Sequence, residues 1–259
     1  MLTKPQSDAA NALTTLGSQR VWSLLVTVFG DLAQNEGDVI EGPVVSALMA
    51  DIGVKPEATR VALHRLRNDD WIASLKKGRT SQHSLTAHGR RESAAANPRI
   101  YNFPKQSPEK WQLVILENAS TQTRTSMECL GFAPFMPRVY LGASNANAPH
   151  DAVVLMPKVV PTWLAAQFEP KGLLQDYAAL HHALLGMRQA LGDTDPLTAR
   201  DTAVLRCLIV HSWRRLVLKH PDLPRALYSE SWRGHECRQL VSDLLIRLPK
   251  PNLGKMLQD

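Results

Sequence analysis

The sequence predicts an α+β protein built from three successive regions, and changes of pattern along the chain support this. The first region combines short amphipathic helices with two strand-like runs around Lys77-Gly78. The second contains short apolar or alternating runs typical of strands, and the third returns to the helical period of 3.6 residues. The predicted boundaries are a flexible N-terminus at 1–16, a first domain at 17–97, a linker at 98–107, a small α+β domain at 108–170 and a helical C-terminal domain at 171–259.

Three helices are predicted at the start of the first domain. The segment RVWSLLVTVFGDL has apolar residues at three- and four-residue spacing from Val21 onward, which indicates an amphipathic helix. Pro43 suits the first turn of a second helix, which is expected to end at Gly53. A short turn at 54–56 leads to a third helix beginning at Glu57, so the last two helices form a helix-turn-helix.

A basic β-hairpin is predicted directly after these helices. Strand-like residues at 71–72 and 84–85 flank a polar segment centred on Lys77-Gly78. Three helices followed by a hairpin is the order of a winged helix. Another helix is expected from about Thr86 to Ala96, before Pro98.

The rest of the chain is expected to form short strands and then long helices. Residues 126–132 resemble the end of a helix, and another helix is expected to begin near Pro161. The predicted strands lie at 111–117, 136–142 and 152–157, and the predicted long helices at 172–191, 198–220 and 235–248.

Composition excludes several classes of protein. The 259 residues are 44% hydrophobic and 21% charged, an ordinary globular balance that argues against disorder. Cys129, Cys207 and Cys237 lie far apart without CxxC spacing, which argues against a disulfide framework or a zinc ribbon and fits a reducing cytoplasm. The N-terminus lacks an apolar run typical of a secretory signal, and no apolar stretch approaches the roughly 20 residues that span a bilayer. We therefore expect a cytoplasmic protein, either an enzyme or a binding protein.

Positive charge is concentrated in one short segment. Residues 55–91 contain nine basic and three acidic side chains, a net charge of +6 that equals the net charge of the whole chain. Residues 1–54 have a net charge of −4. A local basic excess is typical of a nucleic-acid contact, although an arginine-rich solvated face would give the same count.

The third helix is predicted to have one apolar and one basic face. At about 100° per residue, an apolar stripe of Thr59, Ala62, Leu63 and Leu66 lies opposite Arg60, Val61, His64 and Arg65. The second helix of a helix-turn-helix enters the major groove, where arginine matches guanine or a phosphate. An ordinary surface helix remains the alternative. The residues predicted to bind double-stranded DNA are Arg60, Val61, His64 and Arg65 of the helix and Lys76, Lys77, Arg79 and Ser81 of the hairpin.

Several segments, in order along most of the chain, resemble a known family. In the N-terminal half these are VFGD at 28–31, RVALHRLRNDDWI at 60–72, GRTSQHSLTAHG at 78–89 and RIY at 99–101. In the C-terminal part they are HSWRRLVLKHPDLPRAL at 211–227 and SWRGHECRQL at 231–240. The chain is similar to the PaaX-like family of winged-helix repressors, which regulate phenylacetate catabolism. It departs from the family pattern at Gln82, His83, His220 and Arg233.

The resemblance implies a fold, partners and an effector. It implies a homodimeric repressor with a winged helix, a small ferredoxin-like middle domain and a helical C-terminal domain. It also implies that an aryl-acyl-CoA thioester such as phenylacetyl-CoA releases the protein from its DNA operator. No other cofactor is expected.

Candidate effector residues lie in two places. Trp213, Arg214 and Arg215 could contact the adenine and phosphates of a CoA ligand, and Arg138 and Tyr140 on a predicted strand could contribute. The alternative is that Trp213 belongs to the core and that its neighbouring arginines make structural contacts.

The sequence shows no catalytic or metal-binding motif. It lacks GxGxxG, GxxxxGK[ST] and GxSxG, so no catalytic residue is predicted. The compact triplet at 235–237 has no HxxxH or CxxC beside it, and no metal site is expected. A non-enzymatic regulator is therefore predicted. The rivals are a winged helix fused to a region that acts on a thioester, and a winged helix that contacts protein or RNA.

Overall fold

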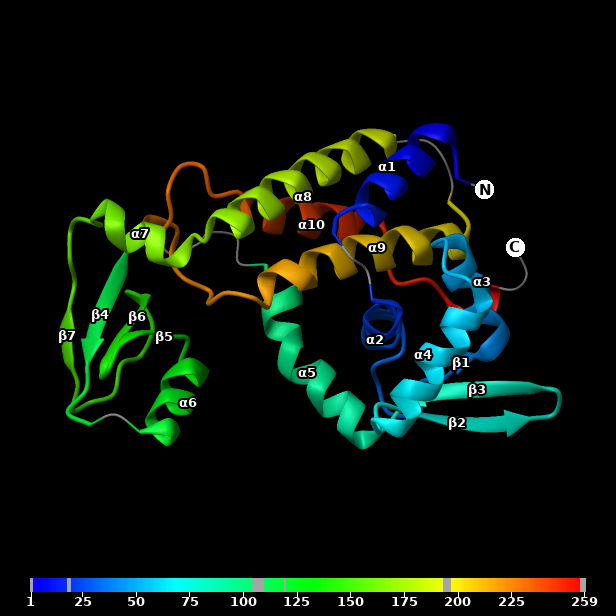
Figure 1. The fold of residues 1–259 in the computed structure, drawn as a ribbon, viewed down its shortest axis with the longest axis horizontal. Helices are drawn as coiled ribbons and strands as arrows, with labels where there is room; N and C mark the ends of the chain where they lie inside the picture. The colour runs from blue at the N-terminus through cyan, green and yellow to red at the C-terminus, as the bar shows by residue number, and fades with distance from the viewer. Residues whose placement is uncertain (1, 18–19, 104–109, 119, 193–196, 257–259) are drawn as a thin grey trace. The chain divides into compact units, whose positions relative to one another are not determined.

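A computed structural model describes residues 2–17, 20–103, 110–118, 120–192 and 197–256 of an α+β protein with two small antiparallel sheets (Figure 1). The chain forms two compact units. The first comprises Met1–Asn102, Ala179–Arg215 and Cys237–Asp259, and the second comprises Phe103–Ala178 and Leu216–Glu236. This grouping differs from the three consecutive domains that the sequence predicts.

The N-terminal part of the first unit contains the predicted helices and hairpin. Its strands form a three-stranded sheet in the order β1-β3-β2, and all pairs are antiparallel. The elements are α1 (Lys4–Thr14), α2 (Val21–Leu32), β1 (Ile40–Glu41), α3 (Gly42–Asp51), α4 (Pro56–Asn68), β2 (Ile72–Lys77), β3 (Thr80–Leu85) and α5 (Ala87–Tyr101).

The sequence of α4 explains both its ends and its packing. Pro56 lies in the first turn, where its missing N–H costs nothing, and Glu57 is favourable near the positive end of the helix dipole. The helix ends before Asp70, whose φ of 54° is left-handed. The predicted apolar stripe is confirmed, since its members are the buried residues of the helix: Thr59, Ala62, Leu63 and Leu66.

The prediction of a flexible N-terminus at 1–16 is wrong for most of that segment, which forms α1. The Gln6 side chain accepts a hydrogen bond from the Thr3 backbone N–H at 2.9 Å, and Pro5 lies in the first turn. Leu13 is fully buried. These capping signals are local, but a polar, alanine-rich composition hides the short apolar face that keeps the helix in place.

Helix α5 continues through Pro98, where the sequence predicts that it has already ended. Proline removes one helical N–H donor and its ring crowds the carbonyl four residues earlier, but contacts beyond Pro98 compensate. Tyr101 Oη donates to Asp31 Oδ1 at 2.8 Å, and the carbonyl of Ile100 accepts from Trp213 Nε1 at 3.0 Å. Residues 98–101 of the predicted linker are therefore helical, and residues 104–107 lie outside the described part of the chain.

A buried ion pair joins α2 to the C-terminal helices within the first unit. Arg206 donates from Nε to Asp31 Oδ2 at 2.6 Å and from Nη2 to Asp31 Oδ1 at 3.0 Å, and also to the carbonyl of Leu248 at 2.7 Å. Both charged side chains are almost fully buried. The three C-terminal helices are α8 (Lys171–Ala190), α9 (Ala199–Val217) and α10 (Gly234–Arg247), with 3₁₀ turns at Arg225–Leu227 and Leu253–Lys255.

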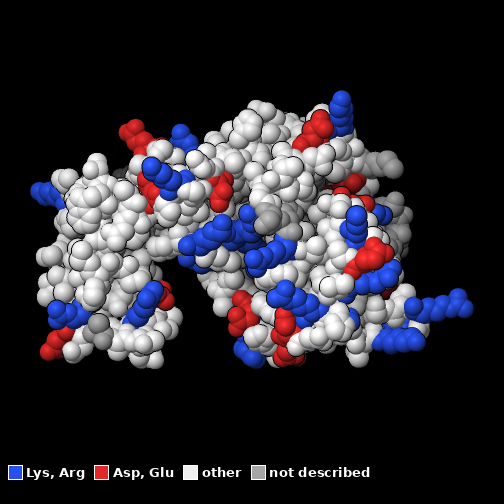
Figure 2. All heavy atoms as spheres, viewed as in Figure 1, with Lys and Arg blue, Asp and Glu red and all other residues white. Residues whose placement is uncertain are grey.

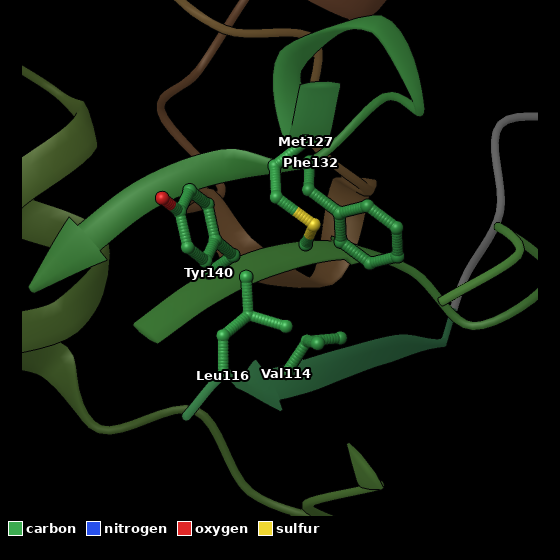
Figure 3. Packing of buried hydrophobic residues seen from close by; sticks show 5 residues of the cluster. All are labelled: Val114, Leu116, Met127, Phe132 and Tyr140. Carbon is green, nitrogen blue, oxygen red and sulfur yellow. The ribbon is translucent and has the colours of Figure 1, made fainter. Parts of the chain in front are cut away.

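The second unit is built around a four-stranded sheet with the order β5-β6-β4-β7. Helix α6 covers one face, and a core of Val114, Leu116, Met127, Phe132 and Tyr140 forms between them (Figure 3). The elements here are β4 (Trp111–Ile115), α6 (Thr121–Cys129), β5 (Ala133–Met136), β6 (Val139–Ala143), β7 (Val153–Leu155) and α7 (Thr162–Phe168).

Strand β5 is absent from the sequence prediction, which has one strand at 136–142. A tight turn at 137–138, with Arg138 at a φ of 66°, separates β5 from β6, and the register shifts between Pro134 and Met136. Proline and an irregular register hide the alternation that marks a strand.

None of the described helices combines the length and apolar character needed to cross a bilayer.

Candidate nucleic-acid interface

Helix α4 presents its predicted DNA-binding side chains to solvent. Arg60, Val61, His64 and Arg65 are all exposed, and Val61 is 70% exposed. The predicted position of these four residues opposite the buried stripe is therefore confirmed. The helix thus offers a continuous surface that no other described element covers.

Arg65 is oriented by contacts with two helices. Its guanidinium carbon lies 5.3 Å from the ring centroid of Trp22 on α2, and Nε donates to Asp69 Oδ2 at 3.4 Å. The side chain remains 61% exposed. A guanidinium over an indole face is electrostatically favourable, so Trp22 restricts Arg65 without burying it.

His64 contacts a residue one turn along α4 that is not among the predicted DNA-binding residues. Asn68 Nδ2 lies 3.3 Å from His64 Nδ1. Because an amide nitrogen donates, Nδ1 accepts and the imidazole proton of the neutral ring lies on Nε2. Continuing the helical steps to Asn68 would have placed it near 180°, opposite the buried stripe.

The hairpin ends in exposed basic side chains. Lys76, Lys77 and Arg79 flank Gly78, whose φ of 60° forms the turn. In the described part of the chain no carboxylate lies within ion-pair distance of these three residues. Figure 2 shows Lys and Arg side chains (blue) extending from the hairpin end at lower right. This tip can therefore approach a polyanion without first breaking an ion pair.

Ser81 has a different environment from the other predicted contacts. It is half-buried, and its hydroxyl lies 3.2 Å from Nε2 of His83. His83 is buried, with Nδ1 2.7 Å from the Ser74 hydroxyl. Burial, together with the positive charge of Arg67, lowers the pKa of His83. Ser81 therefore contacts His83 within its own strand. The polar residue pattern of the strand does not predict this contact.

The predicted effector residues of α9 make structural contacts in the first unit. Trp213 is 1% exposed, and its indole donates to the carbonyl of Ile100. Arg214 Nη1 donates to the carbonyl of Ser23 and to the Thr27 hydroxyl, both at 3.2 Å, and burial lowers the pKa of its guanidinium.

Arg215 belongs to the same structural set, because its Nη1 donates to the carbonyl of Leu16. These contacts match the alternative interpretation, in which Trp213 is core and the two arginines are structural.

Arg138 and Tyr140 lie together at an open hollow of about 780 Å³ in the second unit. Arg138 is exposed and donates to the carbonyl of Glu117 at 3.3 Å, whereas Tyr140 is buried beneath the sheet surface. Arg124, from the first turns of α6, adds a second guanidinium. The hollow therefore combines positive charge with exposed apolar side chains such as Met136.

The triplet at 235–237 is engaged in other contacts. Glu236 accepts from Arg233 at 3.5 Å and lies 3.7 Å from Arg225, and Cys237 is fully buried. Across the described ranges, no group of three or more His, Cys, Asp or Glu side chains could hold a metal ion.

Comparison with known proteins links both ends of the chain to one family. The model of the PaaX-like protein matches residues 20–89, and that of the PaaX-like protein C-terminal domain matches residues 168–252. The transcriptional repressor PaaX of Escherichia coli strain K12 is 26% identical over 265 residues, which cover 93% of this chain and 83% of the relative. A solved structure of an uncharacterized protein from Mycobacterium tuberculosis is 19% identical with a TM-score of 0.47, covering 87% of this chain and 94% of that one.

Proposed function

The chain belongs to the PaaX-like protein family, and on this premise we propose that it is a cytoplasmic DNA-binding repressor of a phenylacetate-type catabolic operon rather than an enzyme. One observation supports this most strongly. Within the matched residues 20–89, an exposed face of α4 and an unpaired basic hairpin tip lie on adjacent elements. This combination suits binding to a duplex.

The N-terminal elements form a winged helix in this proposal. The order α2, β1, α3, α4, β2, β3 supports it, because β1 adds to the edge of the hairpin as the third strand. Helix α4 enters the major groove, where Arg60, His64 and Arg65 contact base edges. Lys76, Lys77 and Arg79 contact phosphates beside it.

The second unit is ferredoxin-like in the same proposal. Strands β4 and β5 flank β6, and helix α6 connects them, which gives the split β-α-β unit of that fold. The link between β6 and β7 is helical in a complete ferredoxin-like fold, whereas residues 144–152 contain no helix here.

The protein acts as a homodimer, and the exposed β7 edge of this sheet is suited to the contact. Register places Leu113 opposite Leu155 and Ile115 opposite Val153, so all four lie on the face away from α6. Val153 is 57% and Leu155 49% exposed. An uncharged aliphatic face can meet its own copy across a two-fold axis without charge repulsion.

The effector is an aryl-acyl-CoA thioester, bound at the hollow near Arg138. Two guanidinium groups suit the phosphates of CoA, and the exposed apolar residues suit an aromatic acyl group. A titration of the protein–promoter complex with phenylacetyl-CoA, benzoyl-CoA and acetyl-CoA tests this. Release by an aryl thioester that is lost in Arg138→Gln supports the site, and release unaffected by that change contradicts it.

The test of the DNA-binding function compares two duplexes. Fluorescence anisotropy should show that the region upstream of the coding sequence binds on the order of a thousandfold more tightly than a random duplex of equal length. Equal affinities with the same salt dependence would contradict sequence-specific repression.

A further inference from the structure

The exposed side of α4 has an aliphatic residue near its centre. Val61 lies at about 200° on the helix, within roughly 30° of the direction opposite the buried stripe. It is 70% exposed, and α4 presents no other large apolar side chain to solvent. Single exposed apolar residues are common on protein surfaces, so its significance depends on what surrounds it.

The polar neighbours of Val61 are fixed to either side of it. Arg65 is drawn toward α2 by the Trp22 ring and toward the helix C-terminus by Asp69. His64 contacts Asn68 in the next turn. Val61 itself is β-branched and has one strongly preferred rotamer in a helix, so its two methyl groups are already in place before DNA arrives.

The chemistry of the major groove limits what Val61 can recognise. It can neither donate nor accept a hydrogen bond, and thymine is the one standard base with a methyl group in that groove. We propose that Val61 contacts the C5-methyl group of a thymine in each half-site and thereby selects a T·A pair. This inference rests on the proposed DNA-binding function and adds the identity of one recognised base pair.

The test replaces single thymines by deoxyuridine, which removes only the methyl group. After footprinting locates the protected half-sites, each thymine is substituted in turn at the symmetric positions. One position should lower the affinity of the unaltered protein about fourfold per half-site, the value for one methyl group withdrawn from an apolar contact. Placing 5-methylcytosine rather than cytosine there should recover a similar factor.

A double-substitution cycle assigns that effect to Val61. Val61→Ala should bind the thymine operator with reduced affinity and should no longer distinguish thymine from deoxyuridine. Ile246→Ala is the matched control, because Ile246 is 77% exposed on α10 and lies outside the proposed interface. It should retain both the affinity and the discrimination. Unchanged circular dichroism melting would show that Val61→Ala is folded.

Two results would overturn the inference, and they differ in what else they affect. Selective promoter binding with no thymine whose methyl effect depends on Val61 removes the inference and leaves the repressor function intact. Failure to prefer the promoter over a random duplex removes both.

Discussion

Trp22 gives Arg65 an orientation before DNA is bound. An exposed cation–π contact is worth about 0.5–1 kcal/mol, so Trp22→Ala should weaken operator binding by roughly two- to fivefold. Trp22→Phe should retain most of the affinity because the aromatic face remains. In anisotropy titrations the effects of Trp22→Ala and Arg65→Ala should not add, since both remove the same contact. Fully additive losses would show that Trp22 acts elsewhere.

His211 makes folding stability depend on pH. It is buried against the Thr27 hydroxyl at 3.0 Å, and burial together with Arg214 and Arg215 lowers its pKa to about 3. Between pH 3 and 6.5, His211 therefore binds a proton in the unfolded chain but not in the folded protein. This contribution to stability is complete above pH 6.5 and is lost, by up to about 1.4 kcal/mol per pH unit, as the pH falls.

The measurement is urea unfolding from pH 4 to pH 8. His211→Asn keeps a polar atom near Thr27 but does not titrate, so its stability should fall less steeply below pH 6.5 than that of the unaltered protein. Parallel curves would mean that other groups cause the acid sensitivity.

At the residue scale, helical periodicity was sufficient to identify the outward face of α4. It correctly separated Arg60 and Val61 from the buried stripe, because burial repeats with the helix turn. It could not find Trp22, which meets Arg65 from another helix, or the inward position of Ser81. The residue spacing of a single segment does not predict its contacts with other elements.

The hairpin should contribute affinity without sequence preference. Lys77→Ala combined with Arg79→Ala removes two cations at the tip, so promoter and random duplexes should weaken alike. The slope of log K against log salt should become shallower by about two, roughly one per lost phosphate contact. Lys158→Ala is a charge control on the second unit, where the side chain is exposed. A loss confined to the promoter would instead indicate base recognition by the wing.

At the element scale, local sequence signals predicted α2, α3, α4 and the hairpin, whose periodicity and turn residues agree with the fold. They failed at α5, where Pro98 predicts a stop. Hydrogen bonds of Ile100 and Tyr101 with residues distant in sequence extend that helix. Local sequence signals do not predict these bonds.

Breaking the buried Asp31–Arg206 pair should strongly destabilise the first unit. Asp31→Ala leaves Arg206 charged and unpaired in the core, at an expected cost on the order of 3–5 kcal/mol in urea unfolding. Asp51→Ala is the matched control, because its pair with Arg200 is about one-third exposed and should contribute under about 1 kcal/mol. Similar losses from both substitutions would contradict this ranking.

Assembly should depend on one face of β7. Leu155→Asp places a charge on the aliphatic sheet face and should give monomers in sedimentation velocity, with operator affinity lowered roughly tenfold or more. Val159→Asp is the control, since Val159 is 74% exposed and lies outside strand β7. Dimers that survive Leu155→Asp would place the interface elsewhere.

At the scale of the whole molecule, the sequence predicted helix-rich and strand-rich stretches but not their grouping. An apolar helix face shows that a partner exists without saying which one. Helix α9 contacts α2 through Thr27 and Asp31. These contacts connect the C-terminal helices of the first unit to its N-terminal helices. Consecutive domain boundaries therefore reflect changes in residue pattern along the chain and do not predict which segments pack together.

The Asp31–Arg206 pair also bears on the order in which the protein is made. Asp31 leaves the ribosome 175 residues before its partner, so the nascent N-terminal helices must wait with an unneutralised carboxylate until almost the entire chain has been synthesised. The N-terminal helices therefore gain this stabilising contact only late in translation. A chain truncated before Arg206 should keep Asp31 unpaired and unfold at a lower urea concentration than the full chain.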